Sequence, residues 1–167
     1  MKRVLVIGSP GAGKSTFSKK LAKITGLPLC HLDLVWYDEE AKQLSRDEFD
    51  VRLAEILKGD EWILDGNYQR TMEMRVKRCD TVILLEYPLE VCLAGLRERV
   101  GRKRDDFRWV DKEVDPELMQ KAIDFSRDKL PRTYELMKKY PNKNFIVFKT
   151  RDEAESYLKG LARWGWL

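Results

Sequence analysis

The stretch that decides the fold runs from Val4 to Ser15 and reads VLVIGSPGAGKS. It opens with four consecutive apolar residues, a pattern typical of a short strand buried on both faces of a sheet. A glycine-rich turn, a lysine and a serine follow at the spacing G-x-x-x-x-G-K-[ST]. Beyond this motif, apolar residues recur at helical spacing. The stretch therefore predicts a strand, a loop and then a helix over residues 14–25.

Each residue type in this motif has a physical reason to bind a triphosphate. Glycines let the backbone turn so that its N–H groups point at phosphate oxygens, and the following helix presents its positive end. We expect Lys14 to reach the β and γ phosphates and the Ser15 hydroxyl to ligate Mg²⁺. The motif thus predicts a site for ATP and Mg²⁺. The expected nucleotide contacts are Gly8, Ser9, Pro10, Gly11, Ala12, Gly13, Lys14, Ser15 and Thr16.

Apolar runs of strand length alternate with segments of helical period along the rest of the chain. The runs fall at residues 29–32, 62–64, 81–85 and 145–148. Alternation of this kind predicts a doubly wound α/β fold, in which helices cover both faces of a parallel sheet. No repeat or linker-like stretch divides the 167 residues, so we expect a single domain over 1–167.

Composition excludes several other classes of protein. Apolar residues make up 43% of the chain, too many for a disordered protein. No apolar run approaches the ~20 residues of a membrane helix, and the first residues lack the pattern of a signal peptide. The three cysteines form neither a metal-binding spacing nor an even-numbered disulfide set, which favours a reducing, cytoplasmic compartment. A net charge of +4 permits anionic ligands without demanding nucleic acid.

Further segments resemble kinases of the adenylate-kinase-like superfamily. Residues 62–70 read WILDGNYQR and residues 80–88 read DTVILLEYP. The closer resemblance is to the DNA topology modulation protein group of predicted kinases, which pairs the phosphate loop with a segment like His31–Trp36, here HLDLVW. The resemblance implies a five-stranded sheet of order 2-3-1-4-5 and phosphoryl transfer from ATP to an acceptor it does not fix. It also implies that residues 149–151, after the fifth strand, lie beside the adenine.

One position departs from the adenylate kinase pattern. Those enzymes place an arginine four residues after the aspartate of D-G-F-P-R, where it binds the phosphate of the acceptor nucleotide. Here Gln69 occupies that position, and Arg70 lies one residue further along. The acceptor therefore stays open among a nucleoside, a nucleotide and another small hydroxyl or phosphate compound, with Arg70 a candidate to bind it.

Two carboxylates follow predicted strands at the sheet edge that should carry the site. Asp33 follows the second strand and could take or orient the proton of an acceptor hydroxyl; the alternative is a turn residue beside a core Trp36. Asp65 ends the third strand and is expected to hold Mg²⁺ together with Ser15, unless it serves the turn at Gly66. Glu86, at the end of the fourth strand, is a weaker candidate for the same role. His31, the sole histidine, is interpreted as a hydrogen-bonded core or strand-end residue rather than a catalytic one. The other expected acceptor contacts are Trp36, Gly66, Asn67 and Tyr68.

Basic residues crowd the segment 97–104 around Gly101. We expect a lid over about 97–116 that closes on the triphosphate, with Arg97 and Arg99 acting in catalysis and Arg102 on the nucleotide. The alternative is an exposed basic face. Just beyond, residues 105–109, DDFRW, are expected to hold the hinge of the lid or to contact the acceptor. Arg127, on a later helix, is placed among the substrate contacts.

These features together predict a small-molecule kinase that uses ATP and Mg²⁺. The rival hypothesis is a regulatory ATPase associated with nucleic acid and affecting DNA topology. The mild net charge argues against it, as does the lack of a basic recognition helix, a zinc knuckle or an aromatic-rich strand. The expected partners are therefore ATP and a small acceptor, without nucleic acid or membrane.

Overall fold

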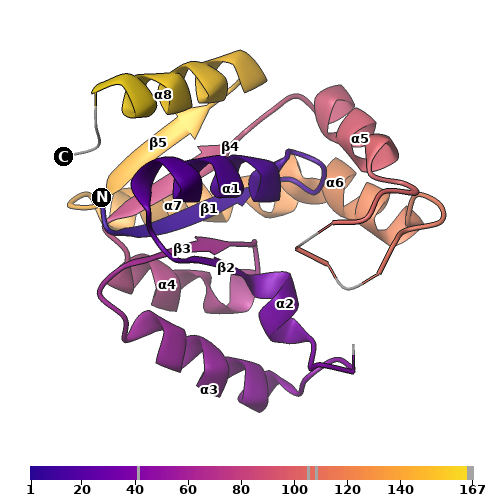
Figure 1. Cartoon of the computed structure of the whole chain (residues 1–167), viewed down its shortest axis with the longest axis horizontal. Coiled ribbons are helices and arrows are strands. Elements are labelled where there is room, and N and C mark those ends of the chain that lie inside the picture. Colours follow the sequence, from indigo (N-terminus) through magenta and orange to yellow (C-terminus); the bar gives the residue numbers. More distant parts are fainter. Residues whose placement is uncertain (41, 105, 108, 165–167) are drawn as a thin grey trace.

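A computed structural model describes residues 1–40, 42–104, 106–107 and 109–164, and in it five strands form one parallel sheet (Figure 1). The strand order is β2-β3-β1-β4-β5, which confirms the predicted fold class and the order that the family resemblance implied. The strands are β1 (Arg3–Gly8), β2 (Leu29–His31), β3 (Trp62–Asp65), β4 (Thr81–Leu85) and β5 (Asn144–Phe148).

Helices connect the strands and cover the sheet. They are α1 (Lys14–Thr25), α2 (Leu32–Trp36), α3 (Arg46–Leu57), α4 (Met72–Arg78) after a short 3₁₀ turn η1 (Gln69–Thr71), α5 (Leu89–Glu98), α6 (Pro116–Asp128), α7 (Leu130–Lys139) and α8 (Arg151–Trp164). The predicted helix over 14–25 coincides with α1. Among the described helices, none is both long enough and apolar enough to cross a bilayer.

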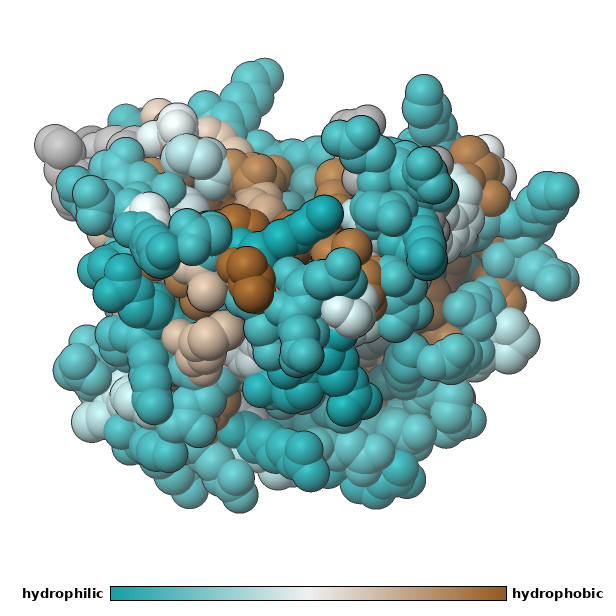
Figure 2. All heavy atoms as spheres, turned by 90° about the horizontal axis from the view of Figure 1, so that it is seen from below, coloured by the Kyte–Doolittle hydropathy of each residue, from teal (hydrophilic) through white to brown (hydrophobic). Residues whose placement is uncertain are grey.

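Two apolar cores lie on opposite faces of the sheet, because side chains alternate along each strand. Leu5 and Ile7 of β1 belong to a core that includes residues of α3, α4 and α6. Val4 and Val6 belong to the other, which includes residues of α1, α5 and α8. In Figure 1, α1 and α8 accordingly lie on one side of the sheet, and α3 and α4 on the other. The face shown in Figure 2 is mostly hydrophilic, with small apolar areas between polar side chains.

The loop after β1 touches α5 backbone to backbone. A Cβ atom on Gly11 would lie 2.0 Å from the carbonyl oxygen of Cys92, and one on Gly95 would lie 2.1 Å from the carbonyl oxygen of Gly11. Gly11 also has φ of 80°, a left-handed conformation that glycine adopts without strain. Two glycines therefore let helix α5 support the loop directly, a role of Gly95 that no sequence pattern predicts.

We predict that Gly95→Ala destabilises the protein although alanine is the better helix former. The added methyl group would meet the Gly11 carbonyl, and overpacking of this kind typically costs about 1–3 kcal/mol. Gly160→Ala in α8 is the matched control, because nothing lies within 4 Å of its Cβ position. It should increase the free energy of unfolding by up to about 1 kcal/mol. Thermal unfolding of both variants is the measurement, and equal stabilisation by the two substitutions would contradict the contact.

Candidate active site

The candidate active site lies where the strands end, at the carboxyl edge of the parallel sheet, the usual location for ligands in this fold class. The loop 8–13 and the first turn of α1 are at the end of β1. Lys14 folds over this loop, since its Nζ donates hydrogen bonds of 3.1 Å to the carbonyl oxygens of both Gly8 and Ser9. Burial lowers the pKa of Lys14, and the carboxylates of Asp65 and Asp33 oppose that shift. A partly desolvated ammonium group in this position interacts strongly with an anion.

Asn67 ties the segment after β3 to the start of the loop. Its Oδ1 accepts a hydrogen bond of 3.1 Å from the Gly8 N–H, and its Nδ2 donates one of 2.6 Å to the Gly8 carbonyl. The amide predicted to contact the acceptor is thus engaged with the loop backbone.

Ser15, the expected Mg²⁺ ligand, contacts a carboxylate far away in the sequence. Its hydroxyl donates a 2.6 Å hydrogen bond to Asp106 Oδ2, across 91 positions of the chain. Arg104 Nη2 lies 3.3 Å from the same oxygen. Burial would raise the pKa of Asp106, but the Ser15 hydrogen bond and the Arg104 charge outweigh it and hold the pKa below its usual value. Asp106 is therefore an anion at the loop, whereas the sequence had suggested a residue of the lid hinge or a contact to the acceptor.

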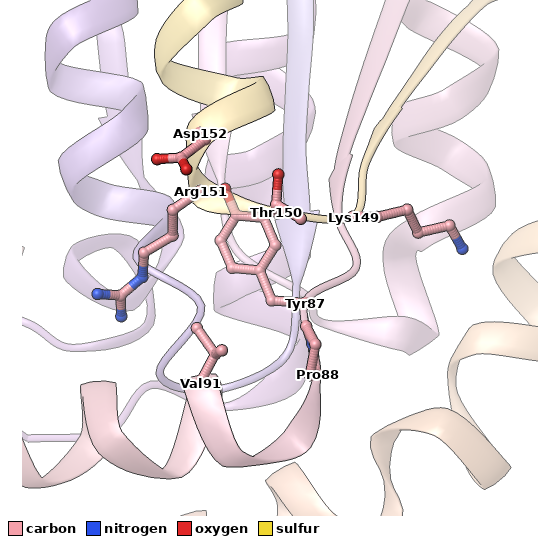
Figure 3. A pocket seen from close by; sticks show the side chains of 7 residues that line it. All are labelled: Tyr87, Pro88, Val91, Lys149, Thr150, Arg151 and Asp152. Atoms are coloured by element: carbon pink, nitrogen blue, oxygen red, sulfur yellow. The ribbon is translucent and has the colours of Figure 1, made fainter.

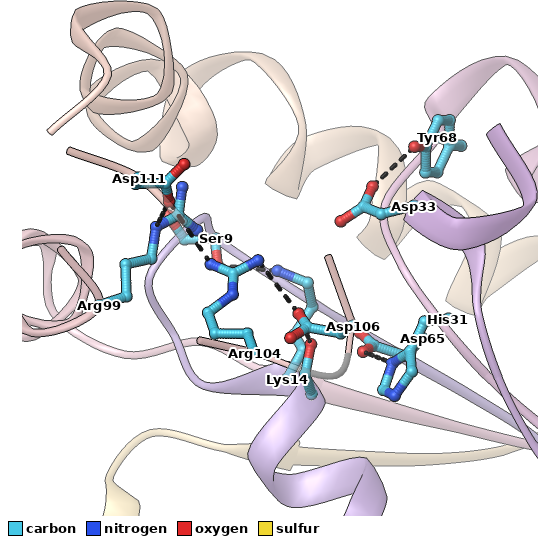
Figure 4. A network of polar contacts seen from close by, with 11 residues as sticks. Ser9, Lys14, His31, Asp33, Asp65, Tyr68, Arg99, Arg104, Asp106 and Asp111 are labelled. Atoms are coloured by element: carbon cyan, nitrogen blue, oxygen red, sulfur yellow. Dashed lines mark hydrogen bonds and ion pairs between the residues drawn. The ribbon is translucent and has the colours of Figure 1, made fainter. Parts of the chain in front are cut away.

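The segment after α5 brings two of its arginines to this cluster. Both pair with Asp111 Oδ2, which lies 3.3 Å from Arg99 Nε and 3.9 Å from Arg104 Nη1 (Figure 4). Burial and the neighbouring Arg104 lower the pKa of Arg99. Arg97 and Arg102, by contrast, are exposed to solvent. Of the predicted lid residues, Arg99 thus lies in the cluster, while Arg104 joins it without having been singled out.

Aromatic residues connect the same segment to the end of α2. Tyr37 lies edge-on to Trp109 at a ring-centroid distance of 5.1 Å, and Trp109 contacts Phe107 at 4.1 Å. Arg104 lies over the Phe107 ring at 5.2 Å. Asp105 and Arg108, the other residues of the expected hinge segment 105–109, lie outside the described part of the chain.

The two predicted carboxylates both lie at this edge. Asp65 is 5% exposed, and its Oδ2 is 2.8 Å from His31 Nδ1, its partner in the register of β2 and β3. This pair confirms the interpretation of His31 as a partnered strand-end residue. Asp33, at the start of α2, accepts a 2.6 Å hydrogen bond from the Tyr68 hydroxyl. Burial raises the pKa of Asp33, although Tyr68 and Lys14 oppose the shift.

Other predicted substrate contacts have partners elsewhere. Trp36 packs against Phe49 and Tyr68, at ring-centroid distances of 4.9 and 5.6 Å. Arg70 makes two 2.6 Å hydrogen bonds to Asp50 at the surface.

The two remaining substrate candidates differ in their surroundings. Arg127 is exposed on α6 and paired with Asp124 and Asp128. Gly66 lies within the turn after β3, where its carbonyl accepts a hydrogen bond from Arg75. The structure therefore does not bring Arg70 or Arg127 into the charged cluster at the loop.

A separate cavity of about 200 Å³ lies at the ends of β4 and β5 (Figure 3). Apolar parts of Tyr87, Pro88 and Val91 line one part of it, and residues 149–152 line another. These include the residues that the family resemblance places beside adenine. A planar nucleobase in this cavity would have both apolar side chains and polar groups as neighbours.

The oxygen donors at the loop suit Mg²⁺. Within the described ranges, no three His, Cys, Asp or Glu residues gather as a preformed metal site. Mg²⁺ nevertheless retains several waters and binds through one or two carboxylates together with substrate phosphates. The Ser15 hydroxyl and the Asp65 carboxylate are the protein groups that would hold it.

Comparisons with known proteins agree with the fold and with part of the sequence resemblance. No family model matches the chain. Over 97 residues it is 31% identical to the adenylate kinases of Thermotoga petrophila and Thermotoga maritima, a stretch that is 56% of this chain and 43% of each of theirs. The match thus spans less than half the length of these curated relatives.

Two solved structures share the whole architecture. A shikimate kinase of Acinetobacter baumannii, in complex with shikimate, gives a TM-score of 0.59 at 20% identity and covers 100% of this chain and 96% of that one. A sugar kinase of a Janibacter species gives 0.58 at 19% identity, with coverages of 98% and 94%. The chain therefore has a shikimate-kinase-like P-loop fold and a distant similarity to adenylate kinases. Its resemblance to the topology modulation group stays a prediction.

We predict that Lys14→Ala lowers the rate of ATP turnover by roughly 10²–10³, the loss typical for one charge-stabilising group. The thermal midpoint should change little, because the ammonium bonds only to two loop carbonyls. Lys23→Ala removes an equal charge from an exposed position on the same helix and is the control. Unchanged turnover in Lys14→Ala would exclude the loop as the site of phosphoryl transfer.

We also predict that a non-hydrolysable ATP analogue with Mg²⁺ slows amide exchange in residues 97–110. The segment carries Asp106, which accepts a hydrogen bond from the Ser15 hydroxyl at the loop, so nucleotide and Mg²⁺ bound there should order it further. Hydrogen exchange with and without the analogue is the measurement. Equal exchange in both states would favour the exposed basic face over a lid.

Proposed function

We propose that the protein is an ATP- and Mg²⁺-dependent phosphotransferase that moves the γ-phosphoryl group onto the hydroxyl of a small molecule. The observation that carries this proposal is the convergence of Asp33, Asp65 and Lys14 on one phosphate loop. The similarity to adenylate kinases supports the reaction class. Phosphoryl transfer needs mainly positioning and charge neutralisation, which such a cluster supplies.

On the donor side, the loop backbone and Lys14 hold the β and γ phosphates. Mg²⁺, when bound through Ser15 and Asp65, would neutralise charge on the same phosphates. Arg99 and Arg104 lie in the neighbouring cluster, where their guanidinium groups can move onto the transferring phosphoryl oxygens. The base of the nucleotide occupies the cavity formed by Tyr87 and its neighbours.

On the acceptor side, the arginines best placed in the sequence to hold a phosphate have other partners. Arg70 is paired with Asp50, and Arg127 is paired on the outer face of α6. Arg75 is fully buried and donates to backbone carbonyls. A phosphate acceptor would need such groups free, since they form the strong bidentate contacts to phosphate. These pairings favour a hydroxyl acceptor.

Asp33 is the general base in this reaction. A carboxylate with a raised pKa is better matched to a hydroxyl proton than an ordinary one. As the acceptor oxygen forms its bond to the γ phosphorus, the bond from that phosphorus to the β–γ bridging oxygen breaks. The hydroxyl proton passes to Asp33, and ADP leaves with the bridging oxygen.

We predict that Asp33→Asn and Asp65→Asn have different effects on acceptor-dependent ATP turnover. Asp33→Asn should lower kcat by about 10²–10⁴ with ATP affinity nearly unchanged, because it removes the base. Asp65→Asn should raise the Mg²⁺ concentration needed for half-maximal rate. Titrations of Mg²⁺ and ATP, with a pool of small metabolites as acceptors, distinguish the two effects.

Arg70→Ala serves as the control in the same titrations. It removes a surface ion pair and should leave turnover within about twofold. A kinase acting on a nucleoside monophosphate through Arg70 would give the reverse pattern, with Asp33→Asn nearly silent and Arg70→Ala severely impaired. Full activity of Asp33→Asn would show that Asp33 serves only the turn, and it would contradict the hydroxyl-acceptor proposal.

A further inference from the structure

A buried arginine organises the turn that follows β3. The Arg75 side chain is inaccessible to solvent and donates to the carbonyl oxygens of Gly66 at 2.8 Å and Tyr68 at 3.0 Å, and also to that of Asn67. Burial lowers its pKa to about 10, so the guanidinium group remains charged at neutral pH. A buried cation is stabilised only by such partners. The three carbonyls are therefore held around one point.

This turn forces Tyr68 into an unusual backbone conformation. Tyr68 has φ of 30° and ψ of 70°, and among the described residues it is the only non-glycine with positive φ. Residues with side chains rarely adopt this region, and surroundings that over-determine the conformation are needed to maintain it. Arg75 supplies part of that restraint through the Tyr68 carbonyl. The Tyr68 ring supplies more, because it stacks on Phe49 at a centroid distance of 5.1 Å.

The strained conformation directs the Tyr68 hydroxyl to Asp33. The bond from this hydroxyl to Asp33 Oδ1 is 2.6 Å long, and Figure 4 shows the two side chains facing each other. Within the described part of the chain, no hydrogen bond is made to the second carboxylate oxygen, Oδ2. The neighbouring residue in the turn, Asn67, is bonded to Gly8. One turn thus fixes both a carboxylate on α2 and the start of the phosphate loop.

We propose that Tyr68 is a positioning residue that orients Asp33 toward the acceptor hydroxyl, and that Arg75 holds it in place through the turn 66–68. The bond to Oδ1 leaves Oδ2 to take the proton. Because Asn67 of the same turn binds Gly8, the base and the γ-phosphate site keep a fixed separation. The inference rests on the proposed role of Asp33 as base.

The hydrogen bond also affects the pH at which Asp33 is ionised. The groups that face Asp33 are Lys14, Tyr37, Asp65, Tyr68, Arg99 and Asp106. Burial raises the pKa of Asp33, and the hydrogen bond from Tyr68 is the largest influence that lowers it. Removal of the hydroxyl should therefore raise the pKa of Asp33 further. Since the base acts as an anion at pH above its pKa, the acid limb of the pH–rate profile should move to higher pH.

The test is Tyr68→Phe, which keeps the stacked ring and removes only the hydroxyl. Its activity is followed as ADP release from ATP and Mg²⁺ with water as the acceptor, across the pH range. We expect kcat to fall about 10- to 100-fold, in line with loss of a hydrogen bond to a charged group. The KM for ATP should stay unchanged, and the acid limb of the pH–rate profile should move to higher pH. The carboxyl ¹³C signal of Asp33, assigned with Asp33→Asn, should titrate at higher pH in the variant without any ligand.

Tyr140→Phe is the matched control, because the Tyr140 hydroxyl donates a bond of the same 2.6 Å length to Glu73, away from the loop. It should alter neither kcat nor the Asp33 titration. If the Asp33→Asn variant is inactive while the Tyr68→Phe variant keeps the kcat and the Asp33 titration of the unmodified protein, the positioning role alone is overturned. A fully active Asp33→Asn would overturn the base and its positioning together. The ligand-free titration and a melting curve separate a misfolded variant from either result.

Discussion

The structure depends on how firmly the backbone of the phosphate loop is held. A loop that binds phosphates with N–H groups works only if those groups already point inward, because reorganisation on binding would cost affinity and rate. Here the loop is held from two directions. The carbonyl of Gly11 lies against Gly95 of α5, and the amide of Asn67 bonds to both backbone groups of Gly8. The first contact links the loop to α5, and the second links it to the turn after β3.

The charged groups of the site already pair with one another around that loop. Lys14 donates to loop carbonyls, Ser15 donates to Asp106, and Arg104 pairs with the same carboxylate. In the proposed function, Lys14 and Arg104 would instead contact phosphate oxygens, and the Ser15 oxygen would ligate Mg²⁺. The two carboxylates for which we propose different roles also have different partners: the Tyr68 hydroxyl donates to Asp33, and His31 pairs with Asp65. The proposed function places these two carboxylates of one sheet edge on opposite sides of the reaction.

Local sequence predicted the parts of the fold that local physics determines. The strand, loop and helix around residues 4–25 were readable because each has its own signal: an apolar run, fixed glycines and helical periodicity. The helix α2 was not predicted, because its five residues are too few to show a helical period. Strand order came from a family resemblance, since alternation alone does not specify which strands are neighbours. Contacts between distant segments left no local signal, which is why the Ser15–Asp106 bond went unpredicted. In the same way, the sequence could not show that Arg70 faces Asp50 at the surface while Arg75 is buried beneath the turn.

The reaction we propose is transfer of a γ-phosphoryl group from ATP to a hydroxyl. The most direct measurement is ³¹P NMR of the purified protein incubated with ATP, Mg²⁺ and a pool of small metabolites, followed by mass spectrometry of any new compound. We expect a new phosphate monoester signal that grows as ADP forms and that requires the intact loop. A product in which the phosphoryl group has joined an existing phosphate, as an anhydride, would contradict the hydroxyl acceptor. Release of inorganic phosphate alone, with every metabolite in the pool unchanged, would contradict the transferase itself.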